Sequence, residues 1–484
     1  MPPDIDLPLL PLMLAGIPRL VTEALREVGV PAATLPRVPL IANGCGRFVL
    51  FDSRSTTSLT RAKRAVEQGL QTIDLAAVLT CLDDAAHASP LGPQAVLAKC
   101  MEHLKHEIEA RGGVWLRIAD YPFPYHSATS IAIGYPAEAA SADVLRKLPR
   151  NLVAHWSHYI STRSRPEQLS CWRELPKVDL GWLVEPDDLE SSRRKTLTHW
   201  TTRAERFRDA GVAVHGLMLT TAGLRLPAAR DLVPFGLGYS GHPDCLPACR
   251  MENGTRESTV DWVQLGTITL RDAITSALRD FTFESSSRTT KVVDDRLDSE
   301  HVLAPDDCEL FESLSDMARS ESLHEWVRAH YLAGEPLFLV AMAGTPSLDQ
   351  ALRQVHAAAT RCPLMWQPTM GEFVRWWRRR QQLALQVWRR DGAYEIQVQG
   401  SADDHVPWAI EIWKGGHVAT VPLKQSENRI AEEGLVFMRA ETKSCCGISL
   451  APNHPLAPRA KLSFPKSSCQ DDSNSSHFSQ GKDS

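Results

Sequence analysis

The chain has 484 residues, more than one compact domain usually holds, so two or three folding units are expected. Hydrophobic residues make up 43% and charged residues 23%, a balance typical of a soluble globular protein. The formal net charge is -5, which argues against a general nucleic-acid binder, because such a protein needs a basic face to neutralise phosphates. We therefore expect no nucleic-acid partner.

The N-terminal stretch "MPPDIDLPLLPLMLAGIPRLV" is apolar, but it carries aspartates and prolines where a secretory signal has positive residues and an unbroken apolar run. No other stretch approaches the roughly 20 apolar residues that span a bilayer. The eleven cysteines are scattered without a CxxC pair, which favours reduced thiols over a zinc ribbon or a disulfide framework. The sequence thus predicts a cytoplasmic protein that does not bind membranes.

The first unit, residues 1–113, has mixed α/β character. A helix is expected over 17–30, and two short strands around a Gly-rich turn are expected over 36–53. Helices are then predicted over 59–84 and 93–113, the second closing at a Gly-Gly pair.

From residue 114 the pattern becomes strand, loop and helix, repeated. Strands are expected in "GVWLRIADYPFPY", "ATSIAIGYP", "LPRNLVAHWSHYIS", "KVDLGWLV", "VAVHGLML" and "PLFLVAMAG". Residues 189–211 predict an amphipathic helix, N-capped by Ser191 or Ser192 and ended by Gly211. Alternating elements of this kind indicate a parallel α/β barrel over residues 114–350.

Connecting helices are expected over 351–382, and an antiparallel β-sandwich over 383–455. The sandwich is predicted from two hairpins, one about Asp391–Gly392 and one about Gly415–Gly416. The polar, Ser-rich tail 456–484 predicts disorder. The basic run "RWWRRRQQ" lies in the last connecting helix, and a solvated helix face explains it most simply.

The order of several short motifs resembles the polysaccharide deacetylase family, the NodB-like carbohydrate esterases. The motifs are "DLGW" with its acidic loop, then "RFRDAGVAVHGLML", "GLRLP" and "LVPFGLGYS", and they cover about half of the chain. The resemblance implies a distorted (β/α) barrel that removes acetyl groups from N-acetylated sugars with a divalent metal such as zinc. It also implies an aspartate pair on the first barrel strand and two histidines four residues apart on a later one, because the metal must activate a water.

The sequence departs from that pattern where the chemistry should lie. Gly134 and Tyr135 stand where the aspartate pair is expected, and Leu183 and Asp187 stand where the two histidines are expected. Residues 341–343 are Ala-Met-Ala, where the family has a histidine. These departures predict a barrel that binds no divalent metal and has therefore lost metal-dependent deacetylation.

Arg225 of "GLRLP" is the one family residue that stays in register, which makes Arg225 and Asp187 the catalytic candidates. A rearranged metal site would have to use His155, Asp187 and His242, with zinc as the metal. The bland alternative is that these histidines belong to the core or to surface loops, and that Asp187 is a solvated loop charge or an anion at a helix N-terminus.

Aromatic residues near the expected barrel mouth are a second kind of candidate: Trp182, Trp200, Tyr121, Phe123 and Tyr135. They could stack on a sugar ring, although aromatic residues on helices and strands more often belong to the core. If the aromatic residues stack on a sugar, Tyr135, Trp182 and Arg225 would bind the substrate.

Three hypotheses follow. In the first, the protein is a pseudoenzyme that needs no cofactor and binds a carbohydrate in the inherited cleft. In the second, it is an active metal-dependent carbohydrate deacetylase with the rearranged site. In the third, it is an interaction module that binds a protein partner through the C-terminal sandwich and the tryptophan-bearing helix.

Overall fold

The computed structural model describes residues 9–17, 21–22, 25–26, 28–35, 48–77, 79–80, 92–137, 155–165, 168–169, 172, 178–189, 193–221, 226, 229–243, 249–253, 261–270, 273, 316–343, 348–399, 408–423 and 427–439. The tail predicted to be disordered, 456–484, lies outside the described residues. Within these ranges, no helix is both long and apolar enough to cross a membrane.

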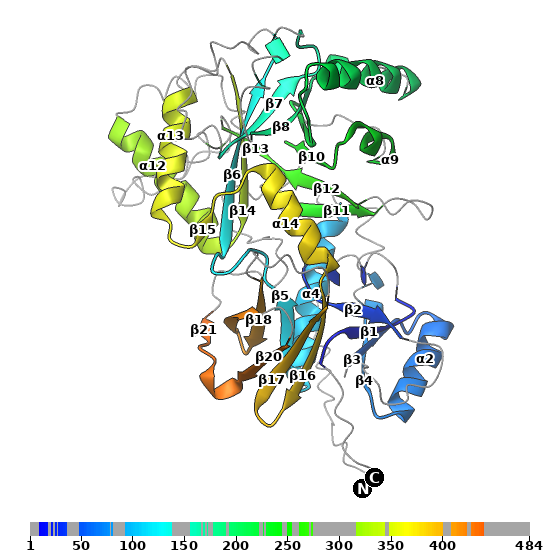
Figure 1. Ribbon diagram of the computed structural model, residues 1–484. Coiled ribbons are helices and arrows are strands. Elements are labelled where there is room, and N and C mark those ends of the chain that lie inside the picture. Colours follow the sequence, from blue (N-terminus) through cyan, green and yellow to red (C-terminus); the bar gives the residue numbers. More distant parts are fainter. Residues whose placement is uncertain are drawn as a thin grey trace, which may run out of the picture.

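A barrel of parallel strands forms the upper part of the molecule in Figure 1. Eight strands are paired in parallel in the order β12-β10-β9-β8-β7-β6-β14-β13. Their bounds are β6 (Ser127–Tyr135), β7 (Ser157–Ser161), β8 (Asp179–Val184), β9 (Gly216–Leu219), β10 (Tyr239–His242), β12 (Asp261–Gly266), β13 (Ile268–Thr269) and β14 (Pro336–Met342). β12 and β13 follow each other in one segment, so pairing of the first with β10 and of the second with β14 nearly closes the ring.

Two short strands extend this sheet. β11 (Cys249–Asn253) pairs with β12 in the antiparallel direction, and β15 (Met365–Trp366) pairs with β6 in parallel. The barrel that the sequence predicts is therefore confirmed.

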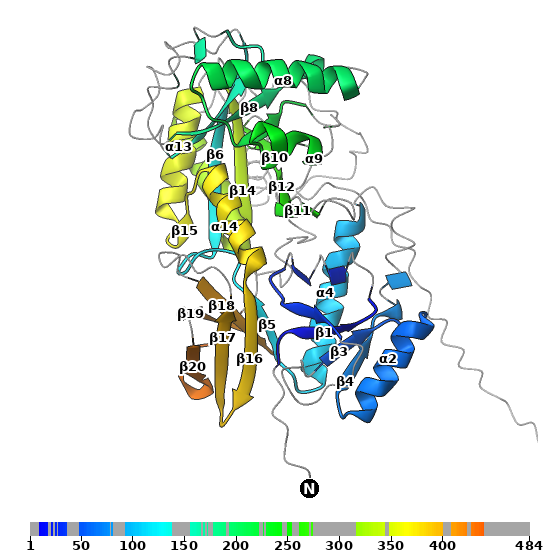
Figure 2. The same cartoon turned by 45° about the vertical axis from the view of Figure 1, so that its right-hand side comes forward.

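Helices cover the outside of the barrel on two sides (Figures 1 and 2). α8 (Arg193–Asp209), α9 (Ala229–Leu232) and the 3-10 helix η2 (Val233–Phe235) lie on one side, and α12 (Asp316–Ala333) and α13 (Leu348–Arg361) on the other. α8 confirms the predicted amphipathic helix, although its proposed caps Ser191 and Ser192 lie outside the described residues.

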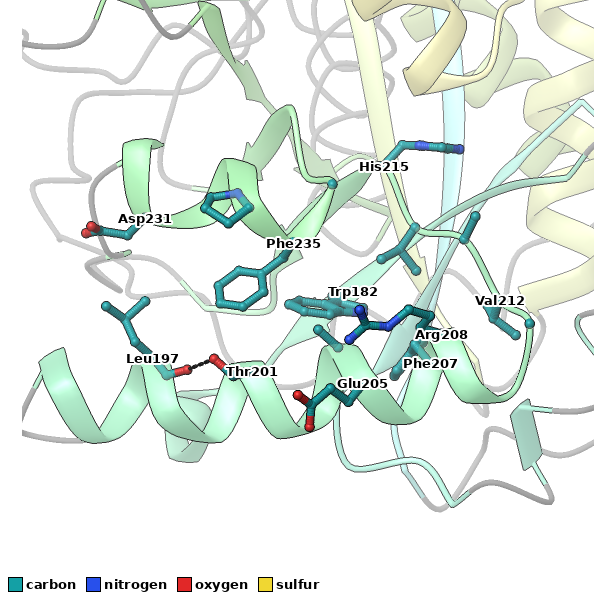
Figure 3. A pocket seen from close by; sticks show the side chains of 16 residues that line it. Trp182, Leu197, Thr201, Glu205, Phe207, Arg208, Val212, His215, Asp231 and Phe235 are labelled. Carbon is teal, nitrogen blue, oxygen red and sulfur yellow. Dashed lines mark hydrogen bonds between the residues drawn. The ribbon is translucent and has the colours of Figure 1, made fainter. Parts of the chain in front are cut away.

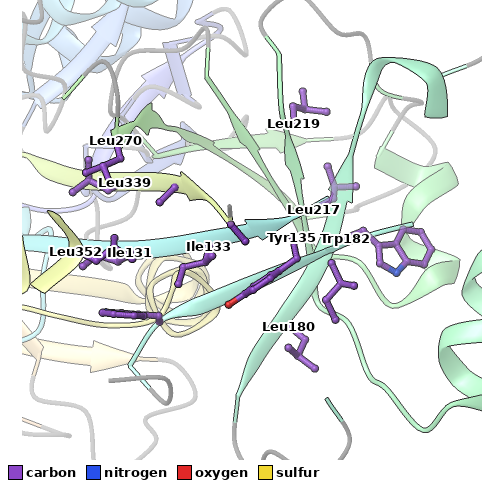
Figure 4. Packing of buried hydrophobic residues seen from close by; sticks show 14 of the residues in the cluster. Ile131, Ile133, Tyr135, Leu180, Trp182, Leu217, Leu219, Leu270, Leu339 and Leu352 are labelled. Atoms are coloured by element: carbon purple, nitrogen blue, oxygen red, sulfur yellow. The ribbon is translucent and has the colours of Figure 1, made fainter. Parts of the chain in front are cut away.

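The side chains of each strand alternate between the helices and the barrel interior, as the period of a β-strand requires. Ile131, Ile133 and Tyr135 of β6 belong to the apolar layer under the helices, which Figure 4 shows together with Trp182 and Leu217. A separate apolar cluster, with members on β7, β8, β9, β10 and β14, fills the interior.

The N-terminal unit is a small parallel sheet of strand order β2-β1-β3-β4. Its elements are β1 (Leu12–Ala15), β2 (Ala32–Thr34), β3 (Phe48–Phe51), α2 (Thr56–Glu67), β4 (Gln71–Asp74) and α4 (Gly92–Ala110). The expectation of one helix over 59–84 was wrong. α2 ends at Glu67, and Gly69 adopts a φ of 79° that only glycine takes readily, which turns the chain into β4.

The antiparallel sandwich has two sheets, of order β16-β17-β20 and β21-β19-β18-β5. The strands are β5 (Trp115–Ile118), β16 (Ala384–Arg390), β17 (Ala393–Gln399), β18 (Trp408–Lys414), β19 (His417–Leu423), β20 (Glu427–Ala431) and β21 (Met438–Arg439), and η3 (Glu432–Gly434) follows β20. Both predicted hairpins are present, and all four of their turn residues have positive φ.

One strand of the sandwich comes from the other end of the chain. The sequence assigns residues 114–350 to the barrel, but β5 pairs with β18 along Trp115–Ile118. The sandwich also shares one apolar core with the N-terminal unit, in which Leu12 and Leu104 join Val387 and Trp413. The two ends of the chain therefore build a common body below the barrel (Figure 1).

α14 (Met370–Gln382) connects the two bodies (Figures 1 and 2). Thr369 caps its N-terminus in a capping box with Glu372. The basic run on this helix is not the solvated face that the sequence suggests, since Trp376, Trp377 and Arg380 are buried. These tryptophans therefore pack inside the chain.

Candidate functional site

The barrel interior beneath the carboxyl ends of the strands is apolar. Leu183 of β8, Met218 of β9 and Met342 of β14 are the inward side chains there. A Cβ added to Gly134 of β6 would lie 2.8 Å from the sulfur of Met342 and 2.9 Å from a methyl of Leu183. A carboxylate at position 134, as the family pattern implies, would have no room and no polar neighbour among these side chains.

Deeper in the interior, glycines face aromatic rings across neighbouring strands. A Cβ on Gly181 would lie 2.5 Å from the ring of Tyr159, and one on Gly216 would overlap the ring of Tyr239. The two tyrosines share a 2.9 Å hydrogen bond between their hydroxyls. Burial, and next the carboxylate of Asp179, raise the pKa of both tyrosines well above the ordinary value, so both remain protonated.

The acidic loop after β8 is held by arginines. Asp188, in the 3-10 helix η1 (Pro186–Asp188), is buried and accepts from Arg203 at 2.7 Å and from Arg163 at 3.1 Å. Its second oxygen accepts from the backbone N–H of Glu185 at 2.8 Å. Both carboxylate oxygens of Asp188 are thus used to fix the loop, so Asp188 anchors structure.

Asp187, the catalytic candidate, lies at the exposed edge of that arrangement. Its side chain is 81% exposed and meets Arg163 at 3.3 Å. Glu185 accepts a 3.1 Å hydrogen bond from the hydroxyl of Ser161, at the end of β7. Asp187 is therefore placed as a solvated loop charge, the non-catalytic alternative that the sequence also allows.

The three residues of the rearranged metal site are not brought together. His155 precedes β7, at the amino end of the barrel strands, whereas Asp187 follows β8 at the carboxyl end. His242 ends β10, and its Nε2 lies 2.8 Å from the hydroxyl of Ser240, which also accepts from the indole N–H of Trp262. Arg225, the remaining candidate, lies outside the described residues.

The side chain of Tyr135 faces the outer helices, away from the barrel interior. It is fully buried, and its hydroxyl lies 3.0 Å from Nδ1 of His158. Its ring packs edge-on against Trp172 at a centroid distance of 4.8 Å. Trp200 and Tyr121 are buried as well, so a sugar at the barrel mouth would not reach these rings.

No group of three or more histidine, cysteine, aspartate or glutamate side chains in the described part of the chain is arranged to hold a metal ion. Where the family would place ligands, Leu183 offers none, and the space over Gly134 is taken by its neighbours. The metal that the resemblance implies therefore does not fit the described residues.

A groove of about 1000 Å³ lies on the outside of the barrel, between α8 and the α9–η2 segment (Figure 3). Its lining residues come from β8, α8, the segment before β9, α9 and η2. Trp182, whose side chain is fully buried and so offers no surface to a ligand, packs beneath the groove, with Phe235 at 5.9 Å and Phe207 at 5.8 Å between ring centroids. The aromatic residue of "VPF" is the sequence feature that could have pointed to this groove.

Polar groups surround the aromatic base of the groove. Glu205 and Arg208 come from α8, Asp231 from α9, and His215 from the turn before β9 (Figure 3). Thr201 also lines the groove, and its hydroxyl donates to the carbonyl of Leu197 at 2.9 Å. The groove thus combines aromatic surface with carboxylates, a guanidinium and an imidazole, a composition suited to a polar ligand with an apolar face.

No family model matches the chain, and no curated protein matches it. Among solved structures, Puue allantoinase is similar at a TM-score of 0.37 and 12% identity, over 54% of this chain and 93% of that one. A protein described as a polysaccharide deacetylase from Mycobacterium smegmatis is similar at a TM-score of 0.34 and 14% identity, over 53% and 93%. A 4-alpha-glucanotransferase from Thermococcus litoralis has a TM-score of 0.28 and 13% identity, over 51% of this chain and 38% of that one.

Likenesses at these TM-scores carry no argument about function. The fold class rests on the strand order described above: a nearly closed parallel (β/α) barrel, with an N-terminal α/β segment and a C-terminal antiparallel sandwich.

Proposed function

We propose that this barrel has lost metal-dependent hydrolysis and serves as a scaffold that binds carbohydrate. The observation that supports the loss of hydrolysis is that Leu183 and Met342 fill the space over Gly134, and that Met218, in the same apolar cluster, fills the space over Gly241. A metal that lowers the pKa of a bound water needs imidazole or carboxylate ligands, and these side chains supply none.

We place the carbohydrate in the outer groove rather than at the barrel mouth. Phe235 is half-buried there, so one face of a sugar ring can pack on it while Trp182 supports it from beneath. Hydroxyl groups of the sugar would then meet Glu205, Asp231 and Thr201 on the rim. Apolar stacking with a few convergent polar groups is the usual chemistry of small-ligand sites.

Two measurements test the loss of catalysis. Metal analysis of the purified chain, together with an assay on acetylated chito-oligosaccharides, is expected to give no stoichiometric zinc and no turnover. Bound zinc with turnover that Asp187→Ala abolishes would establish the active-enzyme alternative and overturn the proposal.

Titration with a panel of oligosaccharides, followed by tryptophan fluorescence and calorimetry, tests the binding. Phe235→Ala is expected to weaken binding by roughly tenfold, because the stacking surface is worth about 1–2 kcal/mol. Val233→Ala is the matched control, since Val233 is exposed on the same 3-10 helix and does not line the groove. Equal loss in both variants, or no binding of any glycan, would contradict the proposal.

A further inference from the structure

A second, smaller cavity lies where the N-terminal unit, α14 and the sandwich meet (Figures 1 and 2). It is half-open to solvent, and its volume is about 290 Å³. A liquid water occupies about 30 Å³, so about ten waters or one small organic molecule would fill it. Thr22, Arg26 and Ala32 line it from the N-terminal unit, and Gln386 of β16 lines it from the sandwich. A ligand in this cavity would therefore contact both units.

The charged groups of the lining are two arginines. Among the described residues that border the cavity, Arg26 and Arg380 are charged, and none is an aspartate or a glutamate. Arg380 is buried and donates to Asp120 at 2.8 Å, and Asp120 also pairs with Arg117 at 2.9 Å. Arg117 pairs in turn with Glu411 at 2.7 Å. The two buried cations are thus balanced by two buried carboxylates, and this network adds no net charge to the cavity.

Arg26 carries the positive charge that the cavity lining leaves unbalanced. It is exposed, and its side chain forms no ion pair or hydrogen bond within the described part of the chain. Thr22 is half-buried and has a helical backbone, as Arg26 does four positions later, and its hydroxyl has no partner among the described residues either. Since both residues line the cavity, a guanidinium and a hydroxyl are available there to a ligand.

The opposite wall and the edge of β2 add neutral donors. Gln386 is half-buried, and its side-chain amide makes no hydrogen bond with the described residues. The N–H of Leu12 donates to the carbonyl of Pro31 at 2.9 Å, so the parallel ladder directs the N–H of the next residue, Ala32, to the outer edge of the sheet. The remaining partly or fully exposed lining is mostly apolar: Pro11, Pro31, Ala33 and Ala384.

We propose that this cavity binds a small organic monocarboxylate with a short apolar body. The planar guanidinium of Arg26 can bind both oxygens of a carboxylate, and Thr22 and Gln386 can donate to the same group. One unbalanced cation matches one negative charge, and the proline and alanine side chains favour an apolar body, which inorganic phosphate lacks. This inference is independent of the carbohydrate proposal, because the outer groove and this cavity share no lining residue.

The experiment uses the full chain with two carboxylate probes, benzoate and 3-methylbutanoate, each matched to the uncharged amide of the same shape. Inorganic phosphate is the third kind of probe, and saturation-transfer NMR and calorimetry measure binding. At least one carboxylate is expected to bind saturably, with its amide at least about tenfold weaker, because a charge-assisted pair with Arg26 is lost. No saturable binding of either carboxylate, equal affinity of carboxylate and amide, or tighter binding of phosphate than of both carboxylates would overturn the proposal.

Arg26→Gln tests the residue itself, with Arg64→Gln as the control, because Arg64 is exposed on α2 and does not line the cavity. Arg26→Gln is expected to weaken the carboxylate by at least about tenfold and to leave the thermal unfolding midpoint unchanged, since an exposed side chain without partners is replaced. Unchanged affinity in Arg26→Gln, or an equal loss in Arg64→Gln, would overturn the proposal. Should Arg26→Gln fail to fold, the comparison of carboxylate with amide on the unmodified chain still decides.

Discussion

The backbone N–H of Gly371, the second residue of α14, donates a 2.9 Å hydrogen bond to Oδ2 of Asp179, the first residue of β8. The same oxygen accepts from the hydroxyl of Ser157 at 2.6 Å, and Ser157 in turn accepts from the N–H of Met370 at 2.8 Å. The positive N-terminus of α14 thus meets a buried carboxylate at the amino end of the barrel. This contact joins the barrel to the body beneath it.

Asp179→Ala is expected to lower the free energy of unfolding by about 3 kcal/mol, because it leaves the N–H of Gly371 and the hydroxyl of Ser157 buried without an acceptor. Urea unfolding monitored by tryptophan fluorescence measures the change. Asp187→Ala is the control, since an exposed carboxylate should change stability by no more than about 0.5 kcal/mol. Equal free energies of unfolding for the two variants would show that the contact between α14 and Asp179 does not stabilise the fold.

A buried ion network lies at the other end of α14. Arg117 of β5 pairs with Glu411 of β18 at 2.7 Å, and Asp120 lies between Arg117 and Arg380. Glu411→Ala should cost about 3–5 kcal/mol, because it leaves Arg117 only partly compensated in a dry site.

Chemical denaturation of Glu411→Ala is best compared with Glu395→Ala. Glu395 forms an ion pair with Arg390 on the surface of the sandwich. Loss of that exposed pair should cost at most about 1 kcal/mol. A small cost for Glu411→Ala would mean that water reaches the network.

Gly216→Ala probes the packing of the barrel interior. The added methyl would overlap the ring of Tyr239, whose hydroxyl is fixed by Tyr159, so the ring cannot swing aside without breaking that bond. Overpacking of this kind should destabilise by about 1–3 kcal/mol. The double variant Gly216→Ala with Tyr239→Leu should recover part of the loss in thermal unfolding, and an additive cost would rule out the contact as its cause.

Local patterns in the sequence predict much of this fold. The hairpins at Asp391–Gly392 and Gly415–Gly416 follow from turn chemistry, and the barrel follows from alternating strands and helices. That Leu183 near the end of β8 cannot bind a metal could also be read from the sequence, because a leucine side chain has no donor atom.

Pairing and burial that depend on residues far apart in the chain could not be predicted from local sequence patterns. β5 joins the sandwich only because β18, almost three hundred positions later in the chain, pairs with it. Arg380 is buried because Asp120 neutralises it, and a lone basic run gives no sign of such a partner. The outer groove lies between α8 and the α9–η2 segment, and strand and helix periodicity does not measure the space between two packed segments.

His330 on α12 should make the folding stability of the protein depend on pH. It is fully buried beside the ring of Trp326, and burial lowers the pKa of His330 to about 3, although the carboxylate of Glu335 lies 3.3 Å away and opposes the shift. In the unfolded chain the imidazole takes up a proton near pH 6.5, so the unfolded state binds more protons than the folded state between pH 6.5 and pH 3.

Stability should therefore fall as the pH drops through that window, by at most about 1.4 kcal/mol per pH unit from this group. His330→Gln should flatten the dependence relative to the unmodified chain, because glutamine stays neutral in both states. Urea midpoints from pH 7 to pH 4 measure the difference, with His417→Gln on the exposed hairpin as control. Parallel pH profiles for His330→Gln and the unmodified chain would show that His330 does not contribute to acid sensitivity.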